Sequence, residues 1–349
     1  MNILIIVSSL SYGGAEKQAV LDANWLSNSH KVHLVSFTKG PLMALVNSSV
    51  EYLQLPKTGY LNAAKHLTKL VKRFEIDVVY SFLFSPMIIS ALSTLSHSAK
   101  IIWAFHSHEY DIPLKSKISF ALLARMPGVN KIVFVSRELK TFFKRRFYLP
   151  GKKLDILYNA TSVEAADATL SKEKKDSFNI GYVGRFVELK RVDILIELAK
   201  FLNQKKITEF KVHLVGDGPE KGNLERMTKD LNVSDKIVFH GFQEDVQSYY
   251  DTFDLFINPS REECLSIALI DAGVRGAPSI AFDAGGNNEI IKDHQSGFIV
   301  NTKEELFTKC LFLLENEKLR WDFGETAIRH CSQYFSKHAH IAKLTALFT

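Results

Sequence analysis

The sequence is poor in the residues that cross-link small domains or hold metal ions. Its 349 residues include three cysteines, Cys264, Cys310 and Cys331, with no close spacing between them. This excludes a disulfide framework and a CxxC metal site, and it favours a reducing compartment. The chain also has no Asp-x-Asp pair and no His/Cys cluster with zinc spacing. A metal site built on paired aspartates or on zinc ligands is therefore not expected.

Long apolar runs are missing as well. The longest stretch without a charged residue, Val78 to Ala99, contains many serines together with threonine, histidine and proline. It is too polar for a bilayer span, which needs about 20 mainly apolar residues. The start of the chain, MNILIIVSSL, lacks a charged leader and is typical of a first strand. These features predict a soluble or membrane-peripheral protein.

The composition is that of a globular protein of about two domains. Hydrophobic residues make up 46% and charged residues 23%, which argues against disorder. Nine prolines and 18 glycines are too few for a collagen-like or low-complexity chain.

Short apolar, β-branched runs alternate with amphipathic stretches along the whole chain. This alternation is typical of βαβ units with a parallel sheet, and six expected strands in each half predict two Rossmann-like domains. The expected strands are Ile3–Ser8, Val32–Phe37, Val78–Phe82, Ile101–Phe105, Ile132–Ser136 and Leu154–Tyr158, then Asn179–Val183, Val212–Val215, Ile237–His240, Leu255–Asn258, Ser279–Phe282 and Phe298–Val300.

The two domains are expected to meet at a polar linker. Residues Thr161–Ser177, TSVEAADATLSKEKKDS, are polar and charged and lack bulky apolar side chains. We place the domains at residues 1–165 and 166–330, followed by a C-terminal helix over 331–349. Two such domains predict a ligand cleft at the carboxyl ends of their strands.

Charge is distributed unevenly between the halves. Residues 1–160 carry 20 Lys and Arg against 9 Asp and Glu, a net charge of +11, whereas residues 161–349 are at −5. This excess indicates either solvated helix faces or a patch for anionic lipid or a phosphate-bearing acceptor. Nucleic acid is not expected, because aromatic residues do not alternate with the basic ones. The excess is concentrated in Lys65, Lys69, Lys72, Arg73, Lys140, Lys144, Arg145, Arg146, Lys152 and Lys153.

A glycine pair follows the first expected strand. In Ser11–Glu16, SYGGAE, Gly13 and Gly14 let backbone N–H groups approach a ligand, and a helix N-terminus favours an anion. The motif is not GxGxxG and no acidic residue ends the second strand, so a nicotinamide cofactor is disfavoured. A structural turn explains the pair equally well.

A second turn, Gly184–Lys190 or GRFVELK, follows the first strand of the second half. Arg185 can hold two phosphate oxygens, and Lys190 can add a charge from the next turn. Two cations at a strand-to-helix turn suit a diphosphate. The alternative is a pair of surface charges at a helix start.

The next two strands also end at glycines. Gly216 and Gly218 lie in Gly216–Pro219, and Gly241 precedes Phe242, where a planar base could lie beside the aromatic ring. Plain strand-end turns explain both segments equally well.

Three acidic residues follow the later strands. In Pro259–Ala272, PSREECLSIALIDA, Glu263 lies in a turn and Asp271 lies about two helical turns further on. Carboxylates there can accept hydrogen bonds from sugar and ribose hydroxyls. Glu289 ends Gly285–Glu289, GGNNE, after the next strand. Each acid could instead be a helix cap or a surface charge.

A histidine follows a strand of the first half. His106 lies just past Ile101–Phe105, where its side chain can face a ligand at the sheet edge. A surface or core histidine is the alternative.

Together these motifs resemble glycosyltransferase family 4, which has the GT-B fold. Gly-Gly-Ala-Glu, Gly-Arg-x4-Lys, Gly-Asp-Gly-Pro, Glu-x7-acid and Gly-Gly-x-x-Glu occur in the family's order over nearly the whole chain. The resemblance implies an α/β fold of two Rossmann-like domains facing across a cleft, with a C-terminal helix crossing back. It implies an acceptor-binding N-terminal domain and a nucleotide-sugar-binding C-terminal domain.

The resemblance also implies residue roles. Arg185 and Lys190 would hold the diphosphate, Glu263 the donor sugar, and Asp271 the ribose. His106 matches the family's histidine near the transferred sugar. The remaining donor contacts implied are Gly13, Gly14, Gly184, Gly216, Gly218, Phe242 and Glu289.

Three positions depart from the family pattern. The second acid of Glu-x7-Glu is Asp271, one methylene shorter, and Cys264 stands where many relatives have glycine. Asn159-Ala160-Thr161 replaces a segment that usually reads Asn-Gly, an apolar residue and Asp.

The implied activity is transfer of a sugar, with retention of configuration, from a UDP- or GDP-sugar to a glycan or lipid-linked acceptor in cell-surface polysaccharide synthesis. No resident cofactor and no metal are implied. The implied location is the cytoplasm, with peripheral binding to the inner face of the plasma membrane. Two alternatives remain open: a GT-B-type sugar-nucleotide epimerase and a non-catalytic sugar-nucleotide binding protein.

Overall fold

The computed structural model describes residues 1–107, 114–166 and 177–348, and contacts divide the chain into two units. Unit 1 comprises Met1–Ala160 together with Lys337–Thr349, and unit 2 comprises Thr161–Ser336. Among the described residues, no helix combines the length and the apolar character needed to cross a bilayer.

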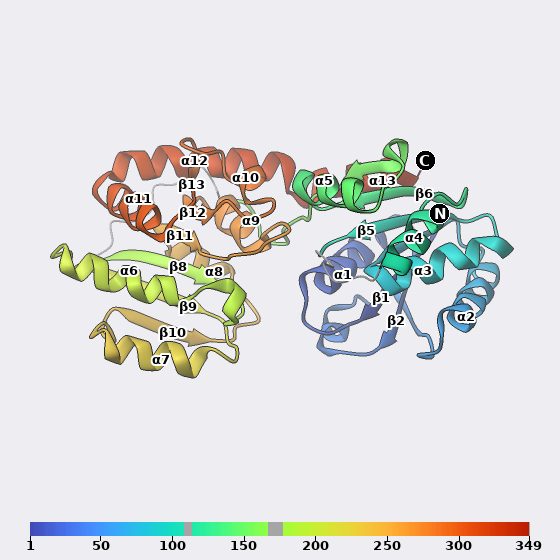
Figure 1. The fold of residues 1–349 in the computed structure, drawn as a ribbon, viewed down its shortest axis with the longest axis horizontal. Coiled ribbons are helices and arrows are strands. Elements are labelled where there is room, and N and C mark those ends of the chain that lie inside the picture. The colour runs from blue at the N-terminus through green and yellow to red at the C-terminus, as the bar shows by residue number, and fades with distance from the viewer. Residues whose placement is uncertain (108–113, 167–176, 349) are drawn as a thin grey trace. The chain divides into compact units, whose positions relative to one another are not determined.

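Unit 1 is built on a seven-stranded, fully parallel sheet in the order β3-β2-β1-β4-β5-β6-β7 (Figure 1). Residues Ile3–Val7 of β1 are all buried, as expected for a strand covered on both faces. The strands are β1 Asn2–Ser9, β2 Lys31–Thr38, β3 Glu51–Gln54, β4 Val78–Phe82, β5 Lys100–Phe105, β6 Val129–Phe134 and β7 Leu154–Ile156.

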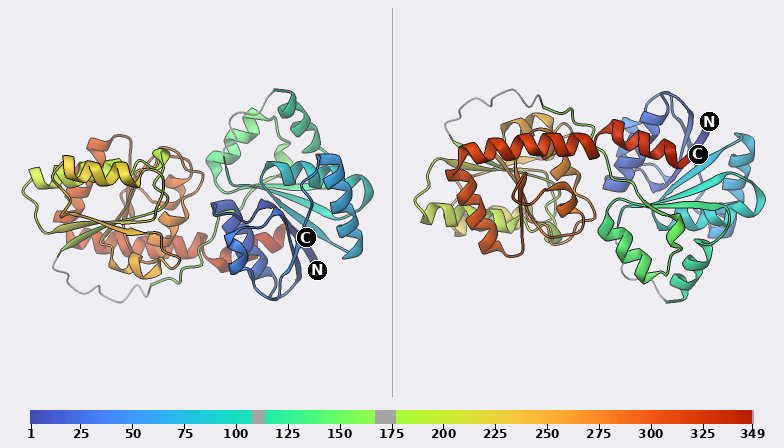
Figure 2. Two further views of the ribbon diagram at one scale, coloured as in Figure 1. Left: turned by 90° about the horizontal axis from the view of Figure 1, so that it is seen from below. Right: turned by 90° about the horizontal axis from the view of Figure 1, so that it is seen from above.

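Helices flank both faces of this sheet. They are α1 Gly14–Leu26, α2 Tyr60–Arg73, α3 Phe84–Ser93, α4 Leu114–Leu123, α5 Arg137–Arg146 and α13 Lys337–Phe348. The α1, α3 and α13 helices contact the central elements, and α13 packs beside α1 (Figure 2). Leu344, Leu347 and Phe348 of α13 join the apolar core of unit 1.

Unit 2 carries a six-stranded parallel sheet in the order β10-β9-β8-β11-β12-β13. Its strands are β8 Phe178–Val183, β9 Phe210–Val215, β10 Ile237–Gly241, β11 Leu255–Asn258, β12 Ser279–Phe282 and β13 Gly297–Val300. Its helices are α6 Asp193–Gln204, α7 Lys221–Asp230, α8 Gln247–Thr252, α9 Ile267–Val274, α10 Asn287–Ile290, α11 Lys303–Glu315 and α12 Glu317–Tyr334.

All twelve expected strands are present, and the two Rossmann-like sheets confirm the predicted fold class. One strand was missed: β3 has four residues and none of them is buried, so it lacks the apolar run that marks its neighbours. The structure thus adds an edge strand beside β2.

The junctions between the units differ from the expected ones. Residues 161–166 of the expected linker belong to unit 2, where the Ala166 N–H donates to Val274 O (2.8 Å); residues 167–176 lie outside the described part. At the other end, α12 continues to Tyr334 and the return to unit 1 starts at Lys337, not at residue 331. Buried Phe335 separates the two helices, and its carbonyl accepts from Thr161 N (3.1 Å).

Candidate functional site

The strand order of unit 2 reverses between β8 and β11, which lie side by side. Ligands of open α/β sheets bind outside the carboxyl ends of the strands at such a switch point. Two of the predicted motifs follow these two strands: Gly184–Lys190 comes after β8, and Pro259–Glu263 comes after β11. The topology therefore brings both motifs to one edge of the sheet.

Lys190 and Glu263 are in direct contact at this edge. Lys190 Nζ lies 2.6 Å from Glu263 Oε1, and the two side chains are 26% and 11% exposed. An ion pair at this depth is less screened by solvent than a surface pair. It fixes the orientation of the carboxylate and leaves part of the ammonium group open.

The backbone next to Lys190 is held in an unusual conformation. Arg191 has a φ of 49°, in the left-handed region that side chains other than glycine rarely adopt. Its guanidinium is clamped by Asp193, with Nε–Oδ1 and Nη2–Oδ2 distances of 3.1 and 2.9 Å. These contacts hold the Arg191 side chain next to the turn that carries Lys190.

Asn258, the last residue of β11, also holds Glu263. Its buried amide nitrogen donates to Glu263 Oε1 (3.2 Å) and to Ser266 Oγ (3.0 Å). Its oxygen accepts from Ser260 N (3.1 Å) and Ser260 Oγ (2.5 Å). The sequence motifs did not include Asn258, although an asparagine that closes an apolar strand was a usable signal.

Arg185 presents a charge beside the pair. Its side chain is exposed, and no side chain among the described residues pairs with the guanidinium. Below it, Tyr182 Oη donates to Arg185 O (3.2 Å). Burial and the nearby Glu263 raise the pKa of Tyr182, so the phenol stays neutral and serves as a donor.

The glycines of the first two turns allow two loops to interlock. Gly216 has a φ of 139°, and a Cβ on it would lie 1.9 Å from Gly184 O; one on Gly218 would lie 2.3 Å from Phe186 O. Backbone hydrogen bonds from Gly184 N to Val215 O (3.0 Å) and from Phe186 N to Asp217 O (2.9 Å) join the loops. Backbone packing therefore accounts for these glycines, and their contact with a donor stays a prediction.

The Gly-Gly-x-x-Glu loop supports Glu263 from the other side. Gly285 has a φ of 54°, and a Cβ there would come 1.7 Å from Glu263 O. Gly286 N donates to Cys264 O (3.0 Å). Glu289 lies on α10 and is partly exposed, and its carbonyl interacts with His330 Nε2 (2.9 Å).

Asp271 points into the protein on α9 and is 5% exposed. Its carboxylate accepts a hydrogen bond from Thr161 Oγ1. Burial, together with Asp271, raises the pKa of Tyr250. The predicted ribose contact remains a prediction, while the structure gives Asp271 a role in holding Thr161, the first residue of unit 2.

Phe242 lies apart from these groups, after the edge strand β10. Its side chain is 54% exposed, and it follows Gly241, which has a φ of 68°. Since β10 is separated from β8 by β9, Phe242 is two strands away from the switch point. Its predicted contact with a base is untested.

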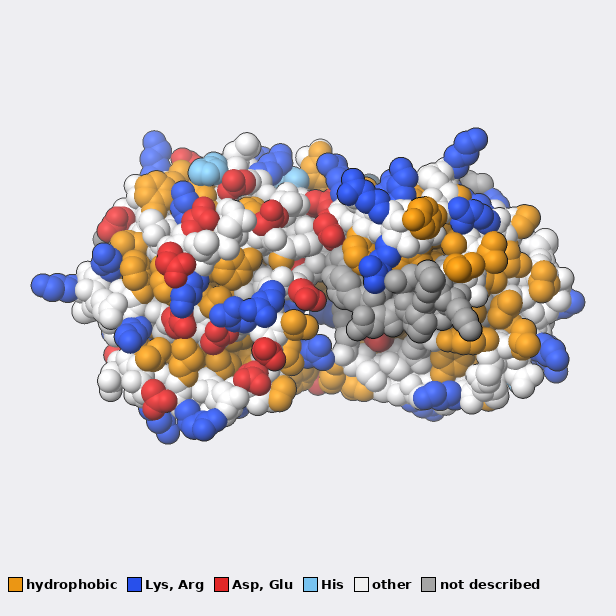
Figure 3. Space-filling view, viewed as in Figure 1, with side chains coloured by type: hydrophobic (Ala, Val, Ile, Leu, Met, Phe, Trp, Pro, Cys, Tyr) orange, Lys and Arg blue, Asp and Glu red, His pale blue; other side chains and the backbone are white. Residues whose placement is uncertain are grey.

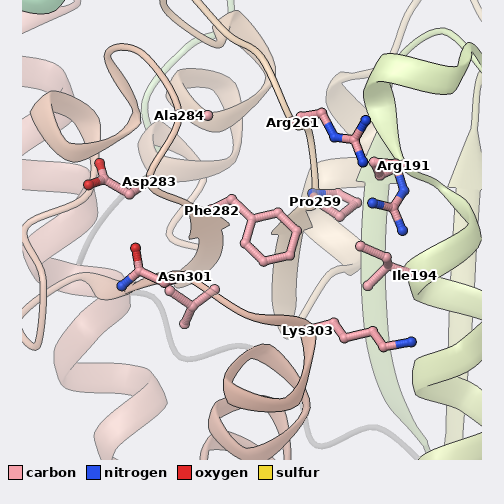
Figure 4. A pocket seen from close by; sticks show the side chains of 10 residues that line it. Arg191, Ile194, Pro259, Arg261, Phe282, Asp283, Ala284, Asn301 and Lys303 are labelled. Atoms are coloured by element: carbon pink, nitrogen blue, oxygen red, sulfur yellow. The ribbon is translucent and has the colours of Figure 1, made fainter.

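A pocket of about 350 Å³ opens between the loops after β11, β12 and β13 and the start of α6. Figure 4 shows the guanidinium groups of Arg261 and Arg191 on one side of the Phe282 ring and Asp283 on the other. None of the predicted site residues lines this pocket. It is a separate polar pocket next to the loop that follows β11.

In unit 1, the strand order reverses between β1 and β4. Gly13 and Gly14 follow β1, and Gly14 begins α1. A Cβ on Gly14 would meet no atom within 4 Å, so the N-terminal turn is open. Leu83, directly after β4, has a φ of 68° and a ψ of 165°, a strained conformation of the kind found at functional sites.

His106 follows β5, the neighbour of β4. It is partly buried and stacks on Phe82 with ring centroids 4.9 Å apart. Burial lowers the pKa of His106 to about 4, against a smaller opposing effect of Asp22. The imidazole is therefore neutral at physiological pH and can accept a proton or a hydrogen bond.

The structure thus brings Lys190 and Glu263 into contact in unit 2, with the exposed Arg185 on the same loop as Lys190 and with Gly184, Gly216 and Gly218 where the loops after β8 and β9 interlock. Gly13, Gly14 and His106 belong to unit 1. Within the described part of the chain, no three His, Cys, Asp or Glu side chains are close enough together to hold a metal ion.

Two known families match the two halves of the chain, with their boundary at residues 165 and 166, a few residues from the junction at 160 and 161 in the structure. Residues 166–330 match the family described as Glycosyl transferases group 1, and residues 12–165 match Glycosyltransferase Family 4. A Campylobacter jejuni N-acetylgalactosaminyltransferase that acts on an undecaprenol-linked glycan is 24% identical over 97% of this chain and 96% of its own. An uncharacterized glycosyltransferase of Haemophilus influenzae is 26% identical over 88% of this chain and 89% of its own.

Solved structures share the whole fold. A glycosyltransferase from Rickettsia africae superposes with a TM-score of 0.87 at 20% identity, covering 99% of this chain and 97% of that one. The Anabaena protein HepE in complex with UDP gives 0.85 at 19% identity, with 99% of each chain covered. The two matched families, the relatives and the fold lead to one conclusion: the chain is a GT-B glycosyltransferase and belongs to glycosyltransferase family 4.

Proposed function

We propose that the protein transfers a sugar from a UDP-sugar to a lipid-linked or polymeric glycan, with retention of the anomeric configuration, and needs no metal ion. The UDP complexes of HepE, which include one with UDP-glucose, support the choice of base. So does an Escherichia coli relative named as a UDP-Gal-dependent galactosyltransferase. Relatives whose names specify undecaprenol diphosphate-linked glycans support the choice of acceptor class.

The observation that carries the proposal is the contact of Lys190 with Glu263 beside the exposed Arg185, at the switch point of the second sheet. When the sugar leaves the donor, negative charge develops on the diphosphate oxygens. Preorganised cations stabilise that charge more in the transition state than in the ground state, which raises the rate.

Glu263 is prepared to bind the donor sugar. Its Oε1 is occupied by Lys190 and Asn258. Within the described residues Oε2 accepts no hydrogen bond, so it is available to a sugar hydroxyl. A carboxylate that binds the sugar beside two cations that bind the diphosphate would hold the scissile bond between them. The acceptor hydroxyl would then attack from the face of the leaving group, which can take the proton.

The test is to measure transfer with Arg185→Ala and Lys190→Ala. Each variant should lose at least a factor of about 10²–10³ in kcat with its circular dichroism spectrum unchanged. Lys229→Ala, which removes an exposed lysine of α7, is the matched control and should keep the wild-type rate. Near-full turnover in both site variants would overturn the assignment.

Two further measurements separate the transferase from its alternatives. Incubation with the donor alone should leave the sugar configuration unchanged, whereas an epimerase would convert it without an acceptor. The anomeric proton coupling of the product should match that of the donor, as retention requires. Donor binding without transfer across a broad acceptor panel would instead indicate a binding protein.

An enzyme that uses a lipid-linked acceptor must reach the membrane surface. Unit 1 has a basic and apolar face that suits binding to such a surface. Figure 3 shows Lys and Arg side chains gathered over α5. Arg125, at the end of α4, donates to Tyr148 O (2.5 Å) and so joins α4 to the segment after α5. Three exposed apolar residues, Ile118, Leu122 and Tyr148, extend this surface. Cations beside apolar anchors suit the interface of an anionic bilayer.

Vesicle flotation tests this membrane proposal. The protein should bind vesicles containing anionic lipid, not neutral ones, and should dissociate as salt shortens the Debye length to a few Å. Lys144→Glu with Arg145→Glu should weaken binding strongly, while Lys205→Glu with Lys206→Glu in unit 2 serves as the control. Binding that resists salt and the first pair of substitutions would refute the electrostatic mechanism.

A further inference from the structure

The pocket of unit 2 beside α6 combines an apolar lining with a polar rim. Its volume of about 350 Å³ lies within the range of about 300–1,000 Å³ that is usual for small-ligand sites. The loops that line it leave the carboxyl ends of β11, β12 and β13, which are neighbours in the sheet. Open α/β sheets bind their ligands at this edge. The buried apolar residues of the lining are Ile194, Pro259, Ala284 and Val300.

The rim offers donors on one side and acceptors on the other. In Figure 4, the guanidinium groups of Arg191 and Arg261 lie on one side of the Phe282 ring, and Asp283 and Asn301 lie on the opposite side. An arginine only donates, an aspartate only accepts, and an asparagine amide does both. A ligand that lies on the ring would therefore meet N–H groups at one end and oxygen atoms at the other.

Hydrogen bonds hold the rim residues in place. The backbone N–H of Arg261 donates to Leu189 O (2.9 Å), and that of Asp283 donates to Val300 O (3.0 Å). Asp283 Oδ1 accepts from Asn288 Nδ2 (3.1 Å), whereas Oδ2 accepts no hydrogen bond within the described part of the chain. Because these groups are already ordered, binding would cost little further conformational entropy.

The charges of the pocket cancel, which favours a neutral ligand. Arg191 and Lys303 are each paired with an acidic residue of α6. Arg261 and Asp283 have opposite charges and no ionic partner among the residues that the structure describes. A phosphate in this pocket would face the Asp283 carboxylate, and a cation would face the Arg261 guanidinium. Such like-charge contacts disfavour both kinds of ligand.

A saccharide is a neutral ligand that matches this lining. One face of a pyranose ring consists of C–H groups, which can pack on an aromatic ring such as Phe282. Its hydroxyl groups both donate and accept hydrogen bonds. They can accept from Arg261 at one edge of the sugar and donate to Asp283 Oδ2 at the other.

We propose that this pocket binds a neutral hexose unit of a glycan, at a site separate from the donor site. Arg191 directly follows Lys190, and Arg261 lies two residues before Glu263, but neither Lys190 nor Glu263 lines the pocket. A bound hexose would thus keep its glycan close to the loops of the donor site, at a raised local concentration. The inference goes beyond the proposed function, because it follows from the lining of the pocket and not from the reaction.

The experiment is saturation-transfer difference NMR on the full chain. The probes are the methyl α-glycosides of glucose, galactose, N-acetylglucosamine and N-acetylgalactosamine. At least one should bind the wild-type protein saturably, with the strongest transfer to its ring C–H protons. Arg261→Ala and Asp283→Ala should each raise its Kd by about tenfold or more, because a hydrogen bond to a charged group is lost. Both side chains are exposed, so the circular dichroism spectra should not change.

Arg226→Ala and Glu225→Ala are the matched controls. They remove an exposed arginine and an exposed carboxylate from α7, away from the pocket, and should keep the wild-type Kd. The proposal fails if none of the four probes binds, or if Arg261→Ala and Asp283→Ala bind as tightly as the wild-type protein. Displacement of the sugar by inorganic phosphate would identify an anion site and would also overturn it.

The outcome is independent of the transfer assay, since binding is measured without a reaction. A wild-type protein that binds a hexose probe through Arg261 and Asp283 but transfers no sugar would overturn the proposed function alone. A protein that transfers sugar and binds none of the probes would overturn the saccharide pocket alone.

Discussion

The ammonium nitrogen of Lys190 lies 2.6 Å from Oε1 of Glu263, although the two residues are 73 positions apart. The contact exists because β8 and β11 are neighbours in the sheet while β9 and β10 lie on the far side of β8. A reversal of strand order thus places a cation and a carboxylate at one point of the edge. Arg185 provides a second cation nearby, and this arrangement is the part of the molecule on which the proposed chemistry depends.

Asn258 should matter for both stability and rate. Asn258→Ala removes the donor to Glu263 Oε1 and leaves the N–H of Ser260 without its acceptor. An unsatisfied buried group costs about 1–3 kcal/mol, so the free energy of unfolding in urea should fall by that amount. The kcat should fall by about 10-fold or more, because Glu263 loses its orientation. Asn223→Ala on exposed α7 is the control; equal effects of both variants would contradict the role of Asn258.

Gly285→Ala should damage the Glu263 loop. The added Cβ would lie 1.7 Å from Glu263 O in a backbone conformation with φ of 54°, so the loop must shift. We expect a loss of about 1–3 kcal/mol in unfolding free energy and a lower kcat.

Gly222→Ala is the matched comparison, since a Cβ at this α7 position meets no atom within 4 Å. It should stabilise the helix by about 0.5–1 kcal/mol. If both glycine variants keep full activity and stability, the packing account of Gly285 is wrong.

Protonation of His106 should lower the free energy of unfolding at acid pH. In the unfolded chain its imidazole binds a proton near pH 6.5, whereas in the folded protein burial lowers the pKa to about 4. The unfolded state therefore binds more protons than the folded state as pH falls through this window. The free energy of unfolding should fall by on the order of 2–3 kcal/mol between pH 7 and pH 4.5. His106→Gln should lose this part of the pH dependence in urea denaturation.

The exposed His66→Gln variant controls for the substitution itself and should keep the wild-type slope. A His106→Gln protein that weakens as steeply as wild type in acid would show that the pKa of His106 is the same in the folded and unfolded states, and would contradict the prediction.

A substitution of Asp271 can distinguish its structural role in unit 2 from the predicted contact with the ribose of the donor. If it holds Thr161, Asp271→Asn should lower the unfolding free energy by about 1–3 kcal/mol and leave the KM for the donor unchanged. Thr161→Val, which removes the hydroxyl donor, should reproduce part of the stability loss. A raised donor KM with wild-type stability would favour the ribose contact that the sequence motif predicts.

Much of the architecture was predictable because parallel strands are buried on both faces. Runs such as Ile3–Val7 are continuously apolar and stand out in the sequence. The β3 strand did not stand out, because its four residues are partly or fully exposed. The expected linker was misjudged at residues 161–166, since their polar side chains resemble a linker although Thr161 is anchored to Asp271.

The sequence by itself determined the two Rossmann-like sheets, the family and the residue types of the donor motifs, because periodicity and short motifs are local. Only the tertiary structure decided which of these residues meet. Strand order brought Lys190 to Glu263, and chain return brought His340 to Asp22 from opposite ends of the chain. The physical reason is that a contact between distant segments depends on how whole elements pack, which no local pattern of residues records.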